Sequence, residues 1–128
     1  MEFIELTLEL PLKSKARPRF AKGRTYMPSD YRDWKEKAKT LLRSHWEREG
    51  LPTIVQAEHI SLRFYGPARH DLDNLCGAVL DSGLPTKDWS GAWKDDRVTV
   101  FPSICASFTK SSESRIDVLI ITDKSHES

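Results

Sequence analysis

The chain has 128 residues, of which 38% are hydrophobic and 30% charged, and its net charge at neutral pH is +1. This length suits one domain with one hydrophobic core, and the composition is that of a globular protein rather than a disordered chain. No apolar run approaches the roughly 20 residues of a membrane-spanning helix, and the acidic start lacks the basic region of a signal peptide. We therefore expect one cytoplasmic domain with no membrane contact.

Residues 3–10 alternate apolar and polar side chains, which predicts a half-buried strand. The next stretch, residues 11–29, is called the basic segment here because it holds six cations and no acid, and we expect it to form a loop. Its cations are Lys13, Lys15, Arg17, Arg19, Lys22 and Arg24. Most charge runs are simply solvated. Here Phe20 and Tyr26 alternate with the cations and Pro18 stiffens the chain, which favours a loop that contacts phosphates.

A helix of about 20 residues should follow the basic segment, with Ser29 as its N-cap and Gly50 as its stop. Its apolar residues recur at helical spacing and are expected to face the core or a second subunit. Residues 57–66 alternate again and predict a second strand. A short second helix is expected over residues 73–83.

The remaining chain predicts a loop at residues 83–94, a strand at 97–109 that bends at Pro102, and a last strand at 114–122. These elements indicate an α+β fold. We expect a single two-layer domain over residues 1–122, with two main helices and a mixed sheet of about four to five strands. Residues 123–128 should form a frayed tail.

The stretch RHDLDNL, residues 69–75, places Asp71 and Asp73 where an extended chain turns into a helix. Residues i and i+2 of an extended segment project to the same side, so the two carboxylates converge. Like charges at short range need a cation or strong hydrogen-bond donors. Asp73 would also suit the N-cap of the helix, but this role leaves Asp71 unexplained. A solvated capping aspartate and a metal site both remain open at this point.

A second acidic pair, Asp95 and Asp96, precedes the strand expected at residues 97–109. In a strand, helix, strand unit, the start or the end of the second strand can return close to the first motif. Three carboxylates are hard oxygen ligands that suit Mg²⁺ or Mn²⁺ and leave coordination positions for water and a substrate phosphate. An acidic metal centre beside a basic segment is suited to phosphodiester hydrolysis in a polyanion.

The motifs RHDLDNL, AVLD and DDRV follow ARPRFAKGRTYMPSDYRDWKE in the chain, within a similarity that covers about residues 3–121. In this order they resemble the RusA family of Holliday junction resolvases, also called crossover junction endodeoxyribonucleases. The resemblance implies a homodimer that binds branched DNA (four-way junctions) and uses Mg²⁺ or Mn²⁺ to nick opposing strands in DNA recombination and repair. Carried over residue by residue, it makes Asp71, Asp73 and Asp96 catalytic metal ligands, with Asp95 as a supporting ligand.

The sequence departs from this family at Gly77. Family members often carry a catalytic lysine four residues after the second aspartate of the motif, and this chain has glycine there. Lys94, Lys87 and Arg69 are candidates for the missing cation. Arg69 and Lys94 also join the cations of the basic segment as expected DNA-binding residues. The lost lysine leaves a second function open, a protein that binds branched DNA on the same fold without cutting it.

Overall fold

The computed structural model describes residues 2–67 and 70–123. These residues form two helices, a mixed four-stranded sheet and a separate two-stranded sheet, which confirms the expected α+β fold. No helix in the described part of the chain has the length and apolarity needed to cross a membrane. The domain limit at residue 122 stays a prediction, and the expected tail beyond Asp123 lies outside the described residues.

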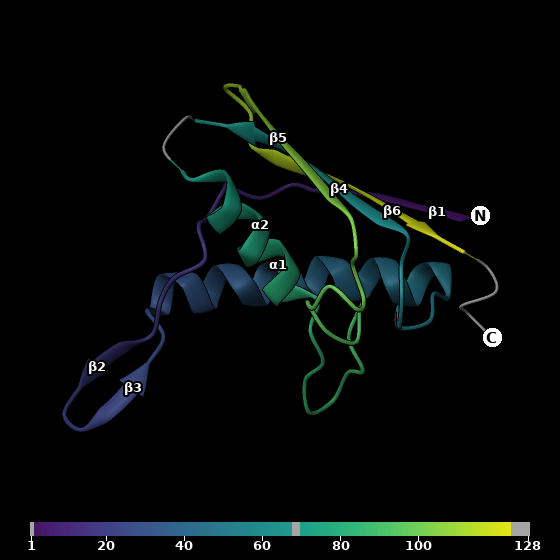
Figure 1. The fold of residues 1–128 in the computed structure, drawn as a ribbon. Coiled ribbons are helices and arrows are strands. Elements are labelled where there is room, and N and C mark those ends of the chain that lie inside the picture. Colours follow the sequence, from purple (N-terminus) through teal and green to yellow (C-terminus); the bar gives the residue numbers. More distant parts are fainter. Residues whose placement is uncertain (1, 68–69, 124–128) are drawn as a thin grey trace.

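The strand order of the main sheet is β1-β6-β4-β5, and β4 with β5 is its parallel pair. Both helices lie on one side of this sheet, whereas the β2–β3 hairpin projects away from it (Figure 1). The elements in chain order are β1 (Glu2–Leu8), β2 (Arg19–Ala21), β3 (Arg24–Tyr26), α1 (Ser29–Glu49), β4 (His59–Gly66), α2 (Leu72–Ser82), β5 (Ile104–Lys110) and β6 (Arg115–Thr122).

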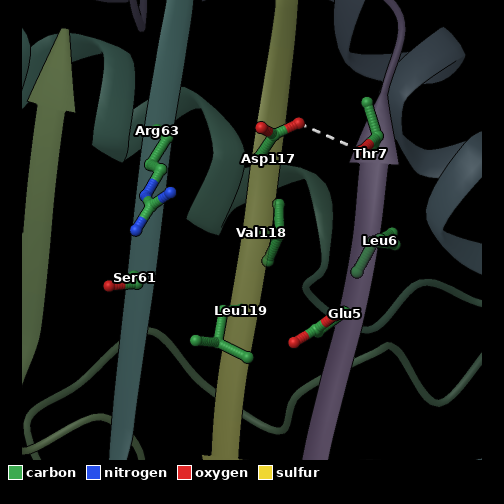
Figure 2. A pocket seen from close by; sticks show the side chains of 8 residues that line it. All are labelled: Glu5, Leu6, Thr7, Ser61, Arg63, Asp117, Val118 and Leu119. Carbon is green, nitrogen blue, oxygen red and sulfur yellow. Dashed lines mark hydrogen bonds between the residues drawn. The ribbon is translucent and has the colours of Figure 1, made fainter.

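The alternation of side chains along the strands separates a buried face of the sheet from an open one. Ile60, Leu62 and Phe64 of β4 are buried, as the sequence pattern predicts, and belong to the same core as the apolar side of α1. Figure 2 shows the other face, where side chains of β1, β4 and β6 line a shallow pocket. There Thr7 Oγ1 donates a 3.0 Å hydrogen bond to Asp117 Oδ1.

The expected N-cap of α1 is wrong by one residue. Pro28 is the N-cap, and Ser29 is the first helical residue. No side-chain capping hydrogen bond closes this helix start, but Asp30 Oδ1, in the first turn, accepts the backbone N–H of Tyr31 at 2.8 Å. One free N–H group of the first turn is thereby satisfied from within the helix. The helix ends as expected at Gly50, which adopts the left-handed conformation of a C-cap with φ 63°.

The strand expected at residues 97–109 is shorter than its pattern suggests. Residues 97–103 are irregular, and β5 begins at Ile104. The backbone N–H groups of Val100 and Phe101 donate to the carbonyl of Arg97 at 2.9 and 3.0 Å, which closes a turn. Val100 and Phe101 are both buried. Their apolar side chains therefore enter the core from a turn instead of alternating along a strand.

Trp93 anchors the segment between α2 and β5. Its ring is fully buried and packs edge-on against Phe101 and Trp46, with ring centres 5.4 and 6.2 Å apart. Its Nε1 donates to the carbonyl of Leu80 in α2 at 2.8 Å. Gly83 makes this packing possible, because a Cβ there would lie 2.3 Å from the Trp93 ring. The expected loop is thus fixed to both helices.

Gly83→Ala should lower the free energy of unfolding by about 3 kcal/mol, because the added methyl group overlaps a fully buried ring. Gly77→Ala is the matched control within α2, since its Cβ would meet only the flexible stem of Lys15, at 3.2 Å. That control should be neutral or stabilising by up to about 1 kcal/mol. Urea denaturation of both variants measures the difference, and equal effects would contradict this account of Gly83.

Candidate functional site

Asp71 and Asp73 both lie at the start of α2. Asp71 is the N-cap residue, with an extended backbone, and its carbonyl oxygen accepts the N–H of Leu75 at 3.1 Å. Asp73 lies within the first turn, where its Oδ1 accepts the N–H of Asn74 at 3.0 Å. The expectation that Asp73 is the N-cap is therefore wrong. The helix begins at Leu72, which moves the capping position back to Asp71.

The two carboxylates are exposed, and Asp73 Oδ1 is bonded locally, to the N–H of Asn74. Neither Asp71 nor Asp73 forms an ion pair among the described residues, and no side-chain capping hydrogen bond engages Asp71. The positive end of the helix dipole favours negative charge at this place. The neighbouring thiol of Cys76 differs in character, because burial and the charge of Asp73 raise its pKa. The available donors at this end of α2 are thus carboxylate oxygens, which suit a hard divalent ion.

The basic segment crosses the start of α2. The backbone N–H of Lys15 donates to the carbonyl of Asn74 at 2.9 Å. Directly before it, Ser14 Oγ lies 3.0 Å from His70 Nδ1, within hydrogen-bond distance. These two contacts join the basic segment to the residues on either side of the aspartates. The backbone of Lys15 is therefore bonded to the first turn of α2, next in the chain to both aspartates.

The basic segment also contains a β-hairpin that the sequence analysis missed. Strands β2 and β3 pair antiparallel around Lys22 and Gly23, whose φ angles are 52° and 76°. A two-residue turn with positive φ at both positions is the favoured hairpin connection, so the Lys-Gly pair was the available signal. Phe20 is 73% exposed and Tyr26 47% exposed. These rings and the cations Arg19, Lys22 and Arg24 thus belong to one hairpin arm, which projects from the rest of the fold in Figure 1.

The predicted DNA-binding cations differ in how free their charges are. Lys13 Nζ lies 2.6 Å from Asp30 Oδ2, and this hydrogen bond lowers the pKa of the Asp30 carboxyl. Arg69 lies outside the described residues. Within the described chain, four cations of the basic segment besides Lys15 are exposed and make no ion pair: Arg17, Arg19, Lys22 and Arg24. The hairpin arm therefore presents most of the unpaired positive charge of the basic segment.

The second acidic pair lies at the other end of α2. The N–H of Trp93 bonds to the carbonyl of Gly83 just past the helix, at 3.3 Å, and Asp95 and Asp96 follow Trp93 closely. Asp95 is engaged locally, since its Oδ1 accepts the N–H of Asp96 at 2.8 Å and its Oδ2 lies 3.2 Å from Arg97 Nε. Lys94 and Lys87 also belong to this segment after the helix.

The topology of the sheet explains why the two acidic pairs lie at opposite ends of α2. Strand β5 runs parallel to β4, so the chain must return along α2 to the beginning of β4 before β5 can start. Asp71 follows the end of β4, whereas Asp95 and Asp96 precede the start of β5. Across residues 2–67 and 70–123, no three His, Cys, Asp or Glu side chains gather closely enough to hold a metal ion. Within one chain, Asp96 does not join Asp71 and Asp73.

Asp81, the last residue of the AVLD motif, has a structural position. Its Oδ2 accepts a 2.8 Å hydrogen bond from the Tyr31 hydroxyl and lies 3.2 Å from Lys35 Nζ. Burial and the carboxylate of Asp81 together raise the pKa of the Tyr31 phenol. The motif therefore joins α2 to α1 and orients the helix whose first residues carry the exposed carboxylates.

Residues 9–121 match the family model described as Endodeoxyribonuclease RusA. The chain belongs to the RusA family. A search of curated proteins found no match. RusA proteins are endodeoxyribonucleases that resolve Holliday junctions, so the expected family is confirmed and it supports a nuclease function. The exposed carboxylates and the hairpin arm are thus features of a member of a DNA-cutting family.

Replacing Arg19, Lys22 and Arg24 of the hairpin arm by alanine should weaken binding to a four-way junction and make it less salt-dependent. Each phosphate contact contributes about 1 to the slope of log K against log salt, so we expect the slope to fall by about 2 to 3. Fluorescence anisotropy over a salt series measures it. Lys37→Ala, an exposed cation on α1, is the control. An unchanged slope in the triple variant would remove the hairpin from the DNA interface.

Proposed function

We propose that this RusA protein is a metal-dependent endonuclease that resolves four-way junctions by paired nicking in DNA recombination and repair, as a cytoplasmic homodimer. The observation that carries the proposal is the pair of exposed, unpaired carboxylates at the start of α2, with the basic segment bonded beside them. Negative charges held together on a surface that also presents cations suit a site where a divalent ion and a DNA phosphate meet.

The donor chemistry fits Mg²⁺ or Mn²⁺. Such ions bind through one or two carboxylates and complete their coordination with water and substrate phosphate, which Asp71 and Asp73 permit. We assign these two residues as metal ligands, with Asp96 as the third and Asp95 in support. When bound, the ion polarises the phosphate and lowers the pKa of the attacking water. As water oxygen bonds to phosphorus, the bond between phosphorus and the 3′ oxygen breaks, and the 3′ oxygen takes up a proton, which leaves a 5′-phosphate and a 3′-hydroxyl.

A second copy of the chain supplies Asp96 in this proposal. Asp71 and Gly83 are twelve residues apart along α2, about 18 Å at the rise of an α-helix, and Asp96 follows beyond that far end. In a homodimer with two-fold symmetry, the second acidic pair of each subunit, Asp95 and Asp96, can approach Asp71 and Asp73 of the other. Each metal site would then be complete only in the dimer. Two identical sites would also account for symmetric nicks in opposing strands.

The cations position the DNA backbone. The hairpin arm, Arg69 and Lys94, which directly precedes the second acidic pair, would contact phosphates. None of these contacts requires a base edge. Exposed Phe20 and Tyr26 offer flat apolar surfaces where bases unstack at a branch point. Recognition would therefore depend on the branched shape of the junction more than on sequence.

Asp73→Asn should lower the rate of junction nicking by more than about a hundredfold, since it removes a metal-ligating charge. Junction binding should be preserved or become tighter, because a negative charge facing phosphate is lost. Nicking of an end-labelled four-way junction and of a matched linear duplex, with Mg²⁺, Mn²⁺ or chelator, measures the rate. Asp33→Asn, an exposed aspartate on α1, is the control. Wild-type nicking by Asp73→Asn would refute the metal-site assignment.

Gly77 supports the alternative, a protein that binds branched DNA without cutting it. The same assay separates the two functions. Metal-dependent, paired nicks on the junction alone establish a resolvase. Tight junction binding by the wild-type chain without nicks in either metal establishes the non-cleaving protein.

Mixing two inactive variants tests whether the site is shared between subunits. If each site takes Asp73 from one subunit and Asp96 from the other, a heterodimer of Asp73→Asn with Asp96→Asn keeps one site in which neither residue is replaced. The mixture should then regain nicking, with single nicks replacing paired ones. If all carboxylates of a site came from one chain, both sites of the heterodimer would be damaged. No recovery, in a mixture shown to exchange subunits, would contradict the shared site.

A further inference from the structure

Gly77 leaves a free place on α2 one turn after Asp73, and Lys15 fills it. A Cβ on Gly77 would lie 3.2 Å from Lys15 Cδ and 3.6 Å from Lys15 Cβ. The aliphatic stem of Lys15 therefore lies against α2 at the position where the sequence lacks a side chain. Residues four apart on a helix are surface neighbours, with Cβ atoms about 5–6 Å apart, so this place adjoins Asp73.

Lys15 is held there by its backbone. Its N–H bonds to the carbonyl of Asn74, at 2.9 Å, and the preceding Ser14 is bonded to His70. The attachment point of the side chain is thus fixed at the first turn of α2, beside the carboxylates. A lysine on a fixed backbone needs to order only its own stem to bring its ammonium to a phosphate.

The charge of Lys15 is available to a ligand. Lys13 is paired with Asp30 and Lys35 with Asp81. Lys15 is exposed, and the described residues offer its ammonium no ion pair. The other described cations considered for this role, Lys87 and Lys94, follow the opposite end of α2. Lys15 therefore combines a stem that lies one turn after Asp73 on α2 with a charge that is unpaired among the described residues.

We propose that Lys15 Nζ contacts the scissile phosphate, so that the basic segment supplies a catalytic cation from outside the helix. This inference rests on the proposed nuclease function. As water adds to phosphorus and the bond to the 3′ oxygen breaks, negative charge grows on the phosphate oxygens. The ammonium of Lys15 stabilises that charge without giving up its proton. Gly77 is part of the arrangement, because a longer side chain there would displace the Lys15 stem.

Moving the cation back onto the helix is the first test. Lys15→Ala should lower the nicking rate at saturating protein by about a hundredfold, while junction affinity falls less than about tenfold, the effect of one phosphate contact. Lys15→Ala combined with Gly77→Lys should regain at least tenfold in rate. Lys37→Ala on α1 should keep the wild-type rate. A loss of affinity with an unchanged saturated rate, or no recovery in a folded double variant, would overturn the proposal.

The second test does not require cutting. Junctions that carry one neutral methylphosphonate at successive positions around the branch point are bound in the presence of chelator. The wild-type chain should lose affinity at one position, and Lys15→Gln, which keeps most of the stem against Gly77, should show no further loss there. Loss of the same affinity by both proteins would refute the contact. If the affinity loss depends on Lys15 but the wild-type chain does not nick, the contact stands and the nuclease function is rejected. If the chain nicks but the affinity loss does not depend on Lys15, only the role of Lys15 is rejected.

Discussion

The parallel pairing of β4 with β5 decides where every candidate catalytic carboxylate lies. A parallel pair cannot be closed by a tight turn, so α2 must carry the chain back along the sheet. Asp71 and Asp73 consequently mark the start of the return, and Asp95 and Asp96 follow its end. The buried ring of Trp93 holds that second end firmly through contacts with Leu80 in the helix and with Gly83 at its C-cap. The separation of the two acidic pairs is therefore a property of the fold.

The same crossover leaves the first turn of α2 open to a segment from elsewhere in the chain. The basic segment takes that place through the backbone of Lys15, and the absent side chain at Gly77 gives room for the lysine stem. The sequence alone shows at Gly77 only the absence of the family lysine. In the fold, the stem of a different lysine, Lys15, lies at this position. Among the described residues, the carboxylates of Asp71 and Asp73 form no ion pair with the ammonium of Lys15, so charges of both signs stay available to a ligand.

Periodicity predicted the parts of the fold that obey it. The strands at β1, β4 and β6 and both helices follow from apolar spacing, and the motif order supplied the family. Local contacts misled the pattern elsewhere. Val98 and Val100 alternate like strand residues, but Val100 is buried from a turn and Val98 is exposed, and the N-cap of α1 is Pro28 instead of Ser29. Contacts between distant residues, such as Lys15 on Gly77, have no periodic signal at all.

A site shared between subunits would tie chemistry to assembly. A single chain offers two hard ligands beside an unpaired lysine, and the cations of its hairpin arm can hold DNA phosphates through charge. If the third carboxylate comes from a second chain, a monomer meeting DNA binds without cutting, and full ligation arises only where both subunits engage one junction. Two-fold symmetry then matches two sites to two opposing strands. The crossover that parts the carboxylates within one chain would in this way confine cleavage to the dimer.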